Sequence, residues 1–377
     1  MAKSWARRFT KTTMVILTIL VAIAFLHVCL VPYLNPKHFW WVGFAGLAAP
    51  YLVLLLAFAT LFWLVMRPII ALLPVVVLGV GYKQVRVFIA LHQSPPPITE
   101  KLPHSLRLVT WNIQSFNGLT QNRAIKKLIR TDVAESILKL QPDIVCLQEF
   151  NHVYSSAKET DNIALFAAEY PFHFFSKDYS RNNGKYVSGC IIFSKFPIVS
   201  TGKIPYPKAE SLIYADVIVH KNDTIRVFNT HLQSFKFKKN DYENIEKIKE
   251  QEQTFAASLN IFNKMKPAFT RRGIQADMVH AALQQAPHPA VICGDFNDVP
   301  NSYTYFKIRG RFKDAFIEKG SGIGRTFVSL APTLRIDYIL THPQFTVQQF
   351  DMVDEGLSDH VLLVADMQLR TSQQPKK

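Results

Sequence analysis

The first 90 residues restrict the fold more than any other part of the chain, because they contain three apolar runs. Residues 12–33 and 39–66 carry no Asp, Glu, Lys or Arg. Since roughly 20 helical residues cross a bilayer, both runs predict transmembrane helices. Aromatic residues near both ends of the second run suit the headgroup level. The third run, residues 68–82, is shorter and spans only if Lys83 and Arg86 extend their charges to the surface or if the helix continues toward Leu91.

Four basic residues precede the first run: Lys3, Arg7, Arg8 and Lys11. They favour a cytoplasmic N-terminus, and Arg67 suits a cytoplasmic turn. We therefore expect three crossings of the plasma (inner) membrane, with everything after Ala90 on the extracytoplasmic side. Two crossings would keep it in the cytoplasm. A cleaved signal peptide is the alternative for the first run, but its length and the two apolar runs behind it favour an integral, multi-pass membrane protein.

The composition changes after residue 90, where "LHQSPPPITEKLPHS" is rich in proline and lacks apolar periodicity. We predict a membrane region at 1–90, a proline-rich linker at 91–104, a folded domain at 105–370 and a disordered tail at 371–377. The folded domain is large for one domain, but a two-sheet sandwich flanked by helices reaches this size. Cys146, Cys190 and Cys293 lie in its apolar runs and are expected to be free and buried.

Six short β-rich runs in the folded domain border polar clusters. The runs and their polar residues are "LRLVTWNIQS" with Asn112, "PDIVCLQEF" with Glu149, "TIRVFNTHL" with His231, "PAVICGDFND" with Asp295 and Asn297, "LRIDYIL" with Asp337, and "LSDHVLLVADM" with Asp359 and His360. Acidic residues beside a buried strand are costly unless a cation or proton partner offsets their charge. We expect the strand ends of two packed sheets to gather these residues at one rim.

Each of these residues also has an ordinary structural interpretation. Glu149 would serve as an exposed strand end, Asn112 as a turn residue and His231 as a hydrogen-bonded histidine. Asp337 would serve as a capped strand residue. The motif "GDFND" argues most strongly for a functional site, because two acids follow one apolar strand within four positions. The combination of all six clusters therefore favours a shared function.

The motifs "TWNI", "LQE", "NTHL", "GDFND", "RIDYIL" and "SDH", in this order, resemble the endonuclease/exonuclease/phosphatase superfamily of deoxyribonuclease I-like, metal-dependent phosphoesterases. The resemblance covers residues 106 to about 369. It implies an α/β (α+β) fold, a four-layer αββα sandwich of two packed mixed β-sheets flanked by helices, here preceded by an N-terminal transmembrane helix bundle. It also implies a divalent metal and attack by water on phosphorus.

Oxygen ligands without thiolates suit Mg²⁺ or Mn²⁺ better than Zn²⁺. We expect Glu149 to be the first metal ligand, with Asn112 beside it and Asp359 completing the set. Asp295 is the candidate that orients or deprotonates the attacking water, and Asn297 would hold that carboxylate or the phosphate in place. Whether one or two ions bind is left open.

His231 and His360 are expected to contact the phosphoryl oxygens. A histidine beside a phosphate works best when it is protonated and fixed by a carboxylate partner. Asp337 matches the family position that pairs with the histidine of "SDH", so we predict a hydrogen bond between Asp337 and His360. Arg325 in "GIGRTF" is a candidate for binding a substrate phosphate, with a structural salt bridge as an equal alternative.

The formal net charge of +15 suits any anionic partner, including nucleic acid, inositol phosphate and lipid surfaces. Phe235, Lys236 and Phe237 suggest contact with a membrane surface, against the alternative of a solvated helix.

The membrane anchor favours a phosphorylated, lipid-linked substrate. The layout is similar to that of membrane-bound teicoplanin-resistance proteins, which are associated with hydrolysis of polyprenyl or lipid phosphates. The alternatives are an anchored nuclease acting on DNA or RNA and a non-catalytic, phosphate-binding scaffold. The sequence does not allow a protein partner to be inferred.

Overall fold

The computed structural model of the chain describes residues 2–92, 100–119, 123–154, 161–208, 210–219, 223–237, 240–243, 245 and 255–370. The chain forms two compact units. The helical unit comprises Met1–Ile89, Phe237–Gly273 and Val299–Phe306, and the sheet unit comprises Ala90–Lys236, Ile274–Asp298 and Lys307–Lys377. Most of the expected linker, residues 93–99, and the expected tail, residues 371–377, lie outside the described residues. The proposed domain boundaries therefore stay predictions.

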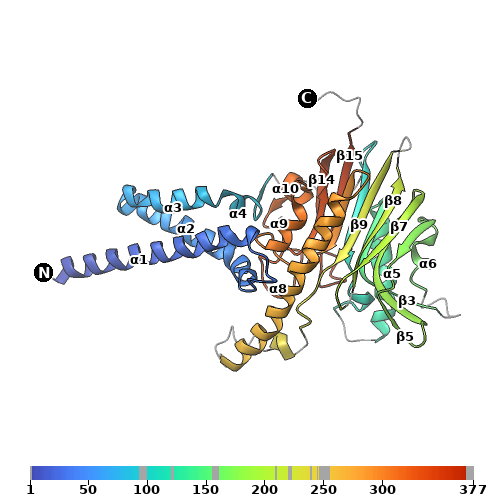
Figure 1. Cartoon of the computed structure of the whole chain (residues 1–377), viewed down its shortest axis with the longest axis horizontal. Coiled ribbons are helices and arrows are strands. Elements are labelled where there is room, and N and C mark those ends of the chain that lie inside the picture. The colour runs from blue at the N-terminus through green and yellow to red at the C-terminus, as the bar shows by residue number, and fades with distance from the viewer. Residues whose placement is uncertain are drawn as a thin grey trace. The chain divides into compact units, whose positions relative to one another are not determined.

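The helical unit begins with α1 (Ala2–Leu30), η1 (Val31–Tyr33), α2 (Val42–Met66), α3 (Pro68–Val80) and α4 (Tyr82–Arg86) (Figure 1). Two segments are long and apolar enough to cross a membrane: Arg8–Tyr33, with mean hydropathy 2.9, and Val42–Met66, with mean hydropathy 2.2. Helix α3 is apolar but has only 13 residues. Length and composition thus support two candidate spans.

The first three helices pack through apolar side chains and expose others. Phe25 of α1 and Leu56 of α2 are fully buried in one shared core with Val77 of α3. Leu54 and Phe58 of α2 are 61% and 62% exposed. Large exposed apolar side chains therefore lie on the same helix as the buried ones.

The sheet unit contains two main mixed sheets. The six-stranded sheet has the order β11 (Lys313–Asp314), β13 (Asp337–Thr341), β10 (Ala290–Asp295), β9 (Thr224–His231), β8 (Ser211–Ile218) and β7 (Ile198–Pro205). The seven-stranded sheet has the order β14 (Phe345–Val353), β15 (Leu362–Leu369), β2 (Leu106–Asn112), β3 (Ile144–Val153), β6 (Tyr186–Ser194) and β4 (Phe172–Phe175), with β5 (Tyr179–Arg181) also paired to β6. A small pair joins β1 (Ala90–Leu91) to β12 (Ser321–Gly322).

The core between the two main sheets is made of residues that alternate along the strands. Cys146 and Ile192 from one sheet meet Val227 and Cys293 from the other, and all are buried. Helix α10 (Ala315–Lys319) contributes residues to the same core. Cys190 is free and buried as well, so the expectation for all three cysteines is confirmed.

Both outer faces of the paired sheets are covered. On the seven-stranded sheet, Val133 and Ile137 of α5 (Arg123–Lys139) pack against Val109 of β2. On the six-stranded sheet, Phe228 and Ile292 alternate with the inner core residues and are also fully buried. Further helices among the described residues are η2 (Gln114–Phe116), α6 (Ala164–Ala167), α8 (Phe255–Gln284) and α9 (Tyr303–Arg309). The expected fold, two packed mixed sheets flanked by helices, is confirmed.

A buried ion pair joins β2 to β15. Arg107 and Asp366 are register partners with side chains 1% and 0% exposed. The Nε atom of Arg107 donates to Oδ1 of Asp366 at 2.6 Å, and its second terminal nitrogen donates to Oδ2 at 2.9 Å. Bidentate geometry of this kind satisfies both charges without water. The ion pair therefore helps to fix the register of β15, the strand that follows the "SDH" motif.

Candidate active site

The six-stranded sheet places three of the expected site residues in one row. His231 and Asp295 end the parallel strands β9 and β10 and are register partners. Asp337 opens the antiparallel strand β13 and is the other partner of Asp295. Gly294 precedes Asp295 with a φ of 129°, and a Cβ there would overlap the carbonyl oxygen of Thr230. Glycine is therefore needed for β10 to approach β9 at this point.

The seven-stranded sheet brings the other residues to its own rim. Asn112 ends β2, and Asp359 and His360 lie just before β15. Glu149 lies in β3, where the pairing with β6 shifts register between Leu147 and Phe150, and its φ is 52°. A bulge of this kind redirects a side chain out of the ordinary alternation of a strand. It explains why Glu149 is not buried in the core.

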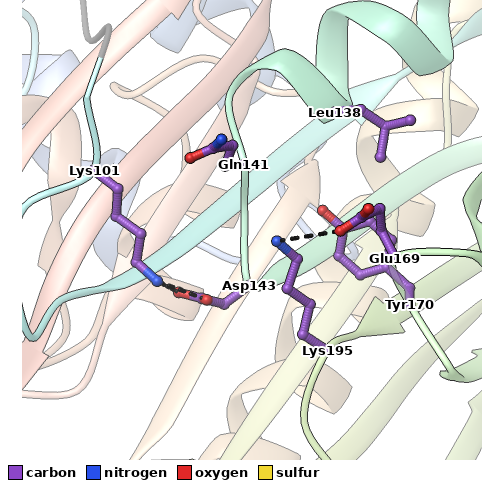
Figure 2. Close-up of a pocket in the computed structure, with 7 residues that line it drawn as sticks. All are labelled: Lys101, Leu138, Gln141, Asp143, Glu169, Tyr170 and Lys195. Carbon is purple, nitrogen blue, oxygen red and sulfur yellow. Dashed lines mark hydrogen bonds and ion pairs between the residues drawn. The ribbon is translucent and has the colours of Figure 1, made fainter.

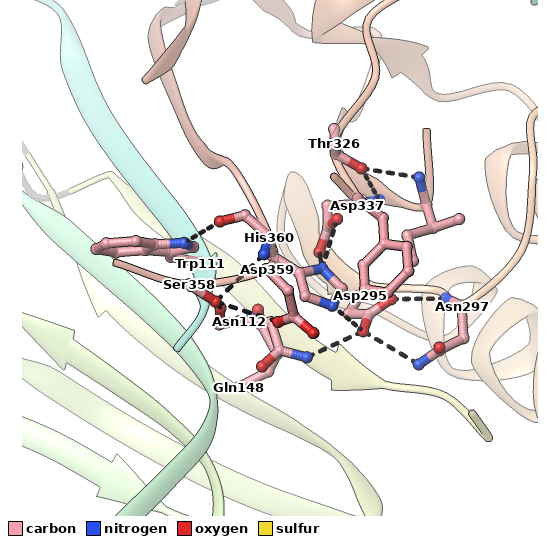
Figure 3. A network of polar contacts seen from close by, with 12 residues as sticks. Trp111, Asn112, Gln148, Asp295, Asn297, Thr326, Asp337, Ser358, Asp359 and His360 are labelled. Carbon is pink, nitrogen blue, oxygen red and sulfur yellow. Dashed lines mark hydrogen bonds and ion pairs between the residues drawn. The ribbon is translucent and has the colours of Figure 1, made fainter. Parts of the chain in front are cut away.

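The two rims meet at one carboxylate oxygen, Oδ2 of Asp295 (Figure 3). The Nδ2 atoms of Asn112 and Asn297 donate to it at 3.0 and 3.1 Å. The Nε2 atoms of His231 and His360 lie 3.5 and 3.7 Å from it. Asp295 is only 1% exposed, so these four side chains surround a carboxylate oxygen that is buried. All four were predicted site residues, and the fold brings them together.

Hydrogen bonds hold both His360 and its partner Asp337 in place. Its Nδ1 atom lies 3.0 and 3.1 Å from the two carboxylate oxygens of Asp337, so the predicted hydrogen bond is confirmed. The indole of Trp111 donates to its carbonyl oxygen at 2.7 Å. The hydroxyl of Thr326 accepts the backbone N–H of Asp337 at 3.1 Å. Burial lowers the pKa of His360, but the charges of Asp337 and Asp295 outweigh it and raise the pKa to about 10.

His231 lies among three carboxylates. Its Nδ1 atom is 3.8 Å from Glu210, and its Nε2 atom is 3.9 Å from Glu149 as well as close to Asp295. Burial lowers the pKa of His231, yet the negative charges of Glu210, Asp295 and Glu149 produce a net increase. Both histidines therefore favour the protonated form, which donates hydrogen bonds to an anion.

Residues 109–360 match the model of the Endonuclease/Exonuclease/phosphatase family. The chain belongs to this family. Residues 11–88 match a second model, a domain of unknown function (DUF8431). No curated protein matches the chain significantly.

Two solved structures show the same fold. An endonuclease/exonuclease/phosphatase from Beutenbergia cavernae DSM 12333 is 22% identical, with a TM-score of 0.51, and the match covers 71% of this chain and 72% of that one. The catalytic domain of human Nocturnin, solved with a bound sulfate anion, is 19% identical, with a TM-score of 0.50, and the match covers 72% and 96%. Family membership makes the chain a hydrolase of the phosphoesterase and nuclease type.

Asp295 has the properties of a general base in this family site. Burial and the neighbouring charge of Asp337 raise the pKa of Asp295, and the two histidines lower it, to a net value of about 6. The backbone N–H of Asn297 donates to its other oxygen at 2.8 Å and fixes the carboxylate. A base works best when its pKa lies near the working pH, so this carboxylate is poised to accept a proton from water.

Two sets of residues could hold the divalent metal that the family uses. Asp295, Asp337 and His360 present ligand atoms within 4.8 Å of one another. The carboxylate of Asp337, however, is already engaged on both oxygens by Nδ1 of His360, at 3.0 and 3.1 Å. We therefore favour the other set, Glu149, Asp359 and Asn112.

The favoured set fits a hard divalent cation. Burial raises the pKa of Asp359, and the charge of Glu149 raises it further while His360 opposes the shift, so two carboxylates repel each other here. A divalent cation would remove that repulsion. Asn112 presents its amide nitrogen to Glu149 at 3.4 Å and to Asp295. Ligation through its oxygen would require a half-turn of the amide.

Three residues that the motif analysis did not select also belong to the site. Gln114 donates to Asp359 at 3.2 Å, and Ser358 donates to the carbonyl oxygen of Asn112 at 2.7 Å. Both lie inside or beside motifs already singled out, which was the available signal. Glu210, next to His231, lies between strands β7 and β8 and has no sequence signal. Arg325 donates to the carbonyl oxygens of Phe327 and Val328, and its predicted role in phosphate binding stays a prediction.

A separate polar pocket lies at the opposite end of the seven-stranded sheet (Figure 2). Its volume is about 470 Å³, and it is lined by Lys101, Leu138, Gln141, Asp143, Glu169, Tyr170 and Lys195. The charges pair within the pocket, because Lys101 lies 2.6 Å from Asp143 and Lys195 lies 4.0 Å from Glu169. None of the predicted site residues lines it, so it is distinct from the candidate active site.

Proposed function

We propose that the chain is a membrane-anchored, divalent-metal-dependent phosphoesterase that hydrolyses a lipid-linked phosphate, pyrophosphate or phosphodiester. The observation that carries the proposal is the position of His231 and His360, whose Nε2 atoms lie 3.5 and 3.7 Å from the same oxygen of Asp295. Two cationic donors beside one buried base match the needs of phosphate ester hydrolysis, in which negative charge is bound while water is deprotonated.

The roles of the side chains follow from their charge states. Asp295 accepts the proton of the attacking water, and Asn297 keeps the carboxylate oriented through the contacts described above. His231 and His360 donate to the phosphoryl oxygens, with Asp337 fixing the ring of His360. Mg²⁺ or Mn²⁺ held by Glu149, Asp359 and Asn112 would neutralise the substrate phosphate and stabilise charge that develops during hydrolysis.

The substrate proposal rests on the helical unit. A bilayer anchor keeps the site close to lipid headgroups, whereas a nuclease gains nothing from that position. We place the helices in the plasma (inner) membrane, with the sheet unit on the extracytoplasmic side, where chromosomal DNA is absent. A reporter enzyme fused after Leu91 tests this orientation. Activity of the reporter only in the cytoplasm would refute the model with three crossings.

The test of function uses the purified full-length protein in detergent, with Mg²⁺ or with EDTA, beside an Asp295→Ala variant. A polyprenyl pyrophosphate, a phospholipid phosphodiester and supercoiled plasmid DNA are offered in parallel. We expect metal-dependent turnover of a lipid substrate that the variant lacks, without nicking of the plasmid. Nicking without lipid turnover would establish an anchored nuclease instead. Metal binding without turnover of any substrate would point to a non-catalytic scaffold.

A further inference from the structure

We propose that Gln84 and Asn301 are positioning residues that hold the segment directly after the catalytic motif. Asn301 lies just after the "GDFND" motif, in the segment Val299–Phe306 of the helical unit. Gln84 lies in α4 of the same unit. Their hydrogen bonds hold the backbone segment that follows Asp295 and Asn297 in the sequence. The catalytic role of Asp295 and Asn297 rests on the proposed function. The hydrogen bonds of Gln84 and Asn301 do not depend on it.

We use the word tie for the buried hydrogen bonds that connect Asn301 to Gln84 and Gln84 to α1. The Nδ2 atom of Asn301 donates to the backbone oxygen and to the Oε1 atom of Gln84, both at 2.8 Å. The Nε2 atom of Gln84 donates in turn to the carbonyl oxygen of Val28 in α1 at 3.0 Å. Gln84 and Asn301 are only 2% and 1% exposed. Removal of either partner would leave buried polar atoms unsatisfied, which costs more than the net value of the bond.

Helix α2 approaches the same loop through a glycine. A Cβ atom added at Gly46 would lie 3.0 Å from the carbonyl oxygen of Asn301, closer than an ordinary van der Waals contact. The backbone of the loop therefore rests directly on the helix. Gly79 in α3 has no atom within 4 Å of its Cβ position, so it offers a matched position without this contact.

The loop between the active site and the tie is held at its other end as well. The hydroxyl of Tyr338 donates to the carbonyl oxygen of Asp298 at 2.8 Å. Asn297 has a φ of 53°, a left-handed conformation that persists only where surrounding contacts enforce it. In that conformation it donates two hydrogen bonds to Asp295. Release of the chain at Asn301 would let Asn297 relax and would loosen the catalytic carboxylate.

The experiment compares Gln84→Ala, Asn301→Ala and the double variant in the full-length protein in detergent. Thr18→Val is the matched control, because it removes another buried hydrogen bond of the helical unit, from the indole of Trp63 to the Thr18 hydroxyl at 2.9 Å. Gly46→Ala and Gly79→Ala form a second pair that leaves all polar groups in place. The two measurements are Mg²⁺-dependent turnover and hydrogen exchange of the amides of Phe296 and Asn297.

We expect each single alanine variant to lower turnover by about 10- to 100-fold, since small misplacements of catalytic groups have effects of this size. The double variant should lose no more than Asn301→Ala, because Gln84→Ala removes only the side-chain one of the two hydrogen bonds that Asn301→Ala breaks. The two amides should exchange faster in these variants and in Gly46→Ala, but not in Thr18→Val or Gly79→Ala. Unchanged exchange at both amides, or losses that multiply in the double variant, would overturn the proposal.

The two measurements separate this proposal from the proposed function. A wild-type protein without turnover of any phosphate ester would refute the function, and hydrogen exchange would still decide whether the tie orders the motif. If Asn301→Ala does not fold, the comparison of Gly46→Ala with Gly79→Ala alone decides whether the tie orders the catalytic motif. Faster exchange in the first and wild-type exchange in the second would support the tie, and equal exchange in the two would refute it.

Discussion

The Nδ1 atom of His360 lies 3.0 Å from Oδ2 of Asp337, and the Nε2 atom of the same ring lies 3.7 Å from Oδ2 of Asp295. One imidazole thus bridges two buried carboxylates from neighbouring strands. This arrangement fixes the orientation of the ring and favours its protonated form, in which Nε2 can donate a hydrogen bond to an anion. Under the proposed function the two acids have separate roles, with Asp337 holding the histidine and Asp295 accepting a proton from water.

Asp337→Asn should lower turnover by about 10²- to 10⁴-fold, the usual range for losing one acid–base group. The amide keeps the shape of the side chain but removes the charge that raises the pKa of His360. The pKa should therefore fall, which a titration of the His360 ring by NMR would measure. Asp354→Asn is the control, because Asp354 is exposed and accepts a hydrogen bond from the backbone N–H of its near neighbour Gly356. Equal activity in the two variants would contradict the assigned role.

The pH dependence of turnover should be bell-shaped. Asp295 acts as a base only when unprotonated, and its pKa is raised to about 6, so activity should rise as the pH increases through about 6. His360 donates only when protonated, and its pKa is raised to about 10, so activity should fall as the pH approaches 10. Initial rates at saturating substrate and metal would test both limbs. A rate that is flat from pH 5 to 7 would exclude Asp295 as the base.

Metal binding should depend on Glu149. Glu149→Gln removes one of two carboxylates whose mutual repulsion a cation relieves, so Mn²⁺ affinity should fall by at least about 10-fold. Electron paramagnetic resonance of free Mn²⁺ measures this without any substrate. Glu169→Gln is the matched control, since Glu169 lies in the pocket at the other end of the sheet. Equal Mn²⁺ affinity in both variants would indicate that the metal binds at Asp295, Asp337 and His360 instead.

The buried pair of Arg107 and Asp366 should be important for stability. Asp366→Ala leaves the Arg107 charge buried without its partner, which costs about 3–5 kcal/mol. Glu169→Ala removes the 4.0 Å partner of Lys195, and because Glu169 is largely exposed the cost should stay below about 1 kcal/mol. Thermal unfolding of the two variants in the same detergent would compare them. Similar midpoints would show that the Arg107 charge reaches water after the substitution.

Part of this site could be predicted from local sequence. The apolar runs before "GDFND" and "LQE" identify buried strands, and an acidic residue that follows such a strand needs a specific reason. The order of the six motifs then led to the family, and through it to the pairing of Asp337 with His360. Burial and periodicity act on neighbouring residues, which is why they can be recognised along one chain.

The amino-acid sequence by itself determined the residue types, the strands that carry them and the apolar helices that precede them. Only the tertiary structure decided that His231 and His360 meet at one oxygen of Asp295 and that Glu210 stands beside His231. It also decided that the segment containing Asn301 packs within the helical unit. These relationships join residues from different strands and sheets, and no local pattern encodes them, because strand order and loop docking depend on the packing of the whole fold.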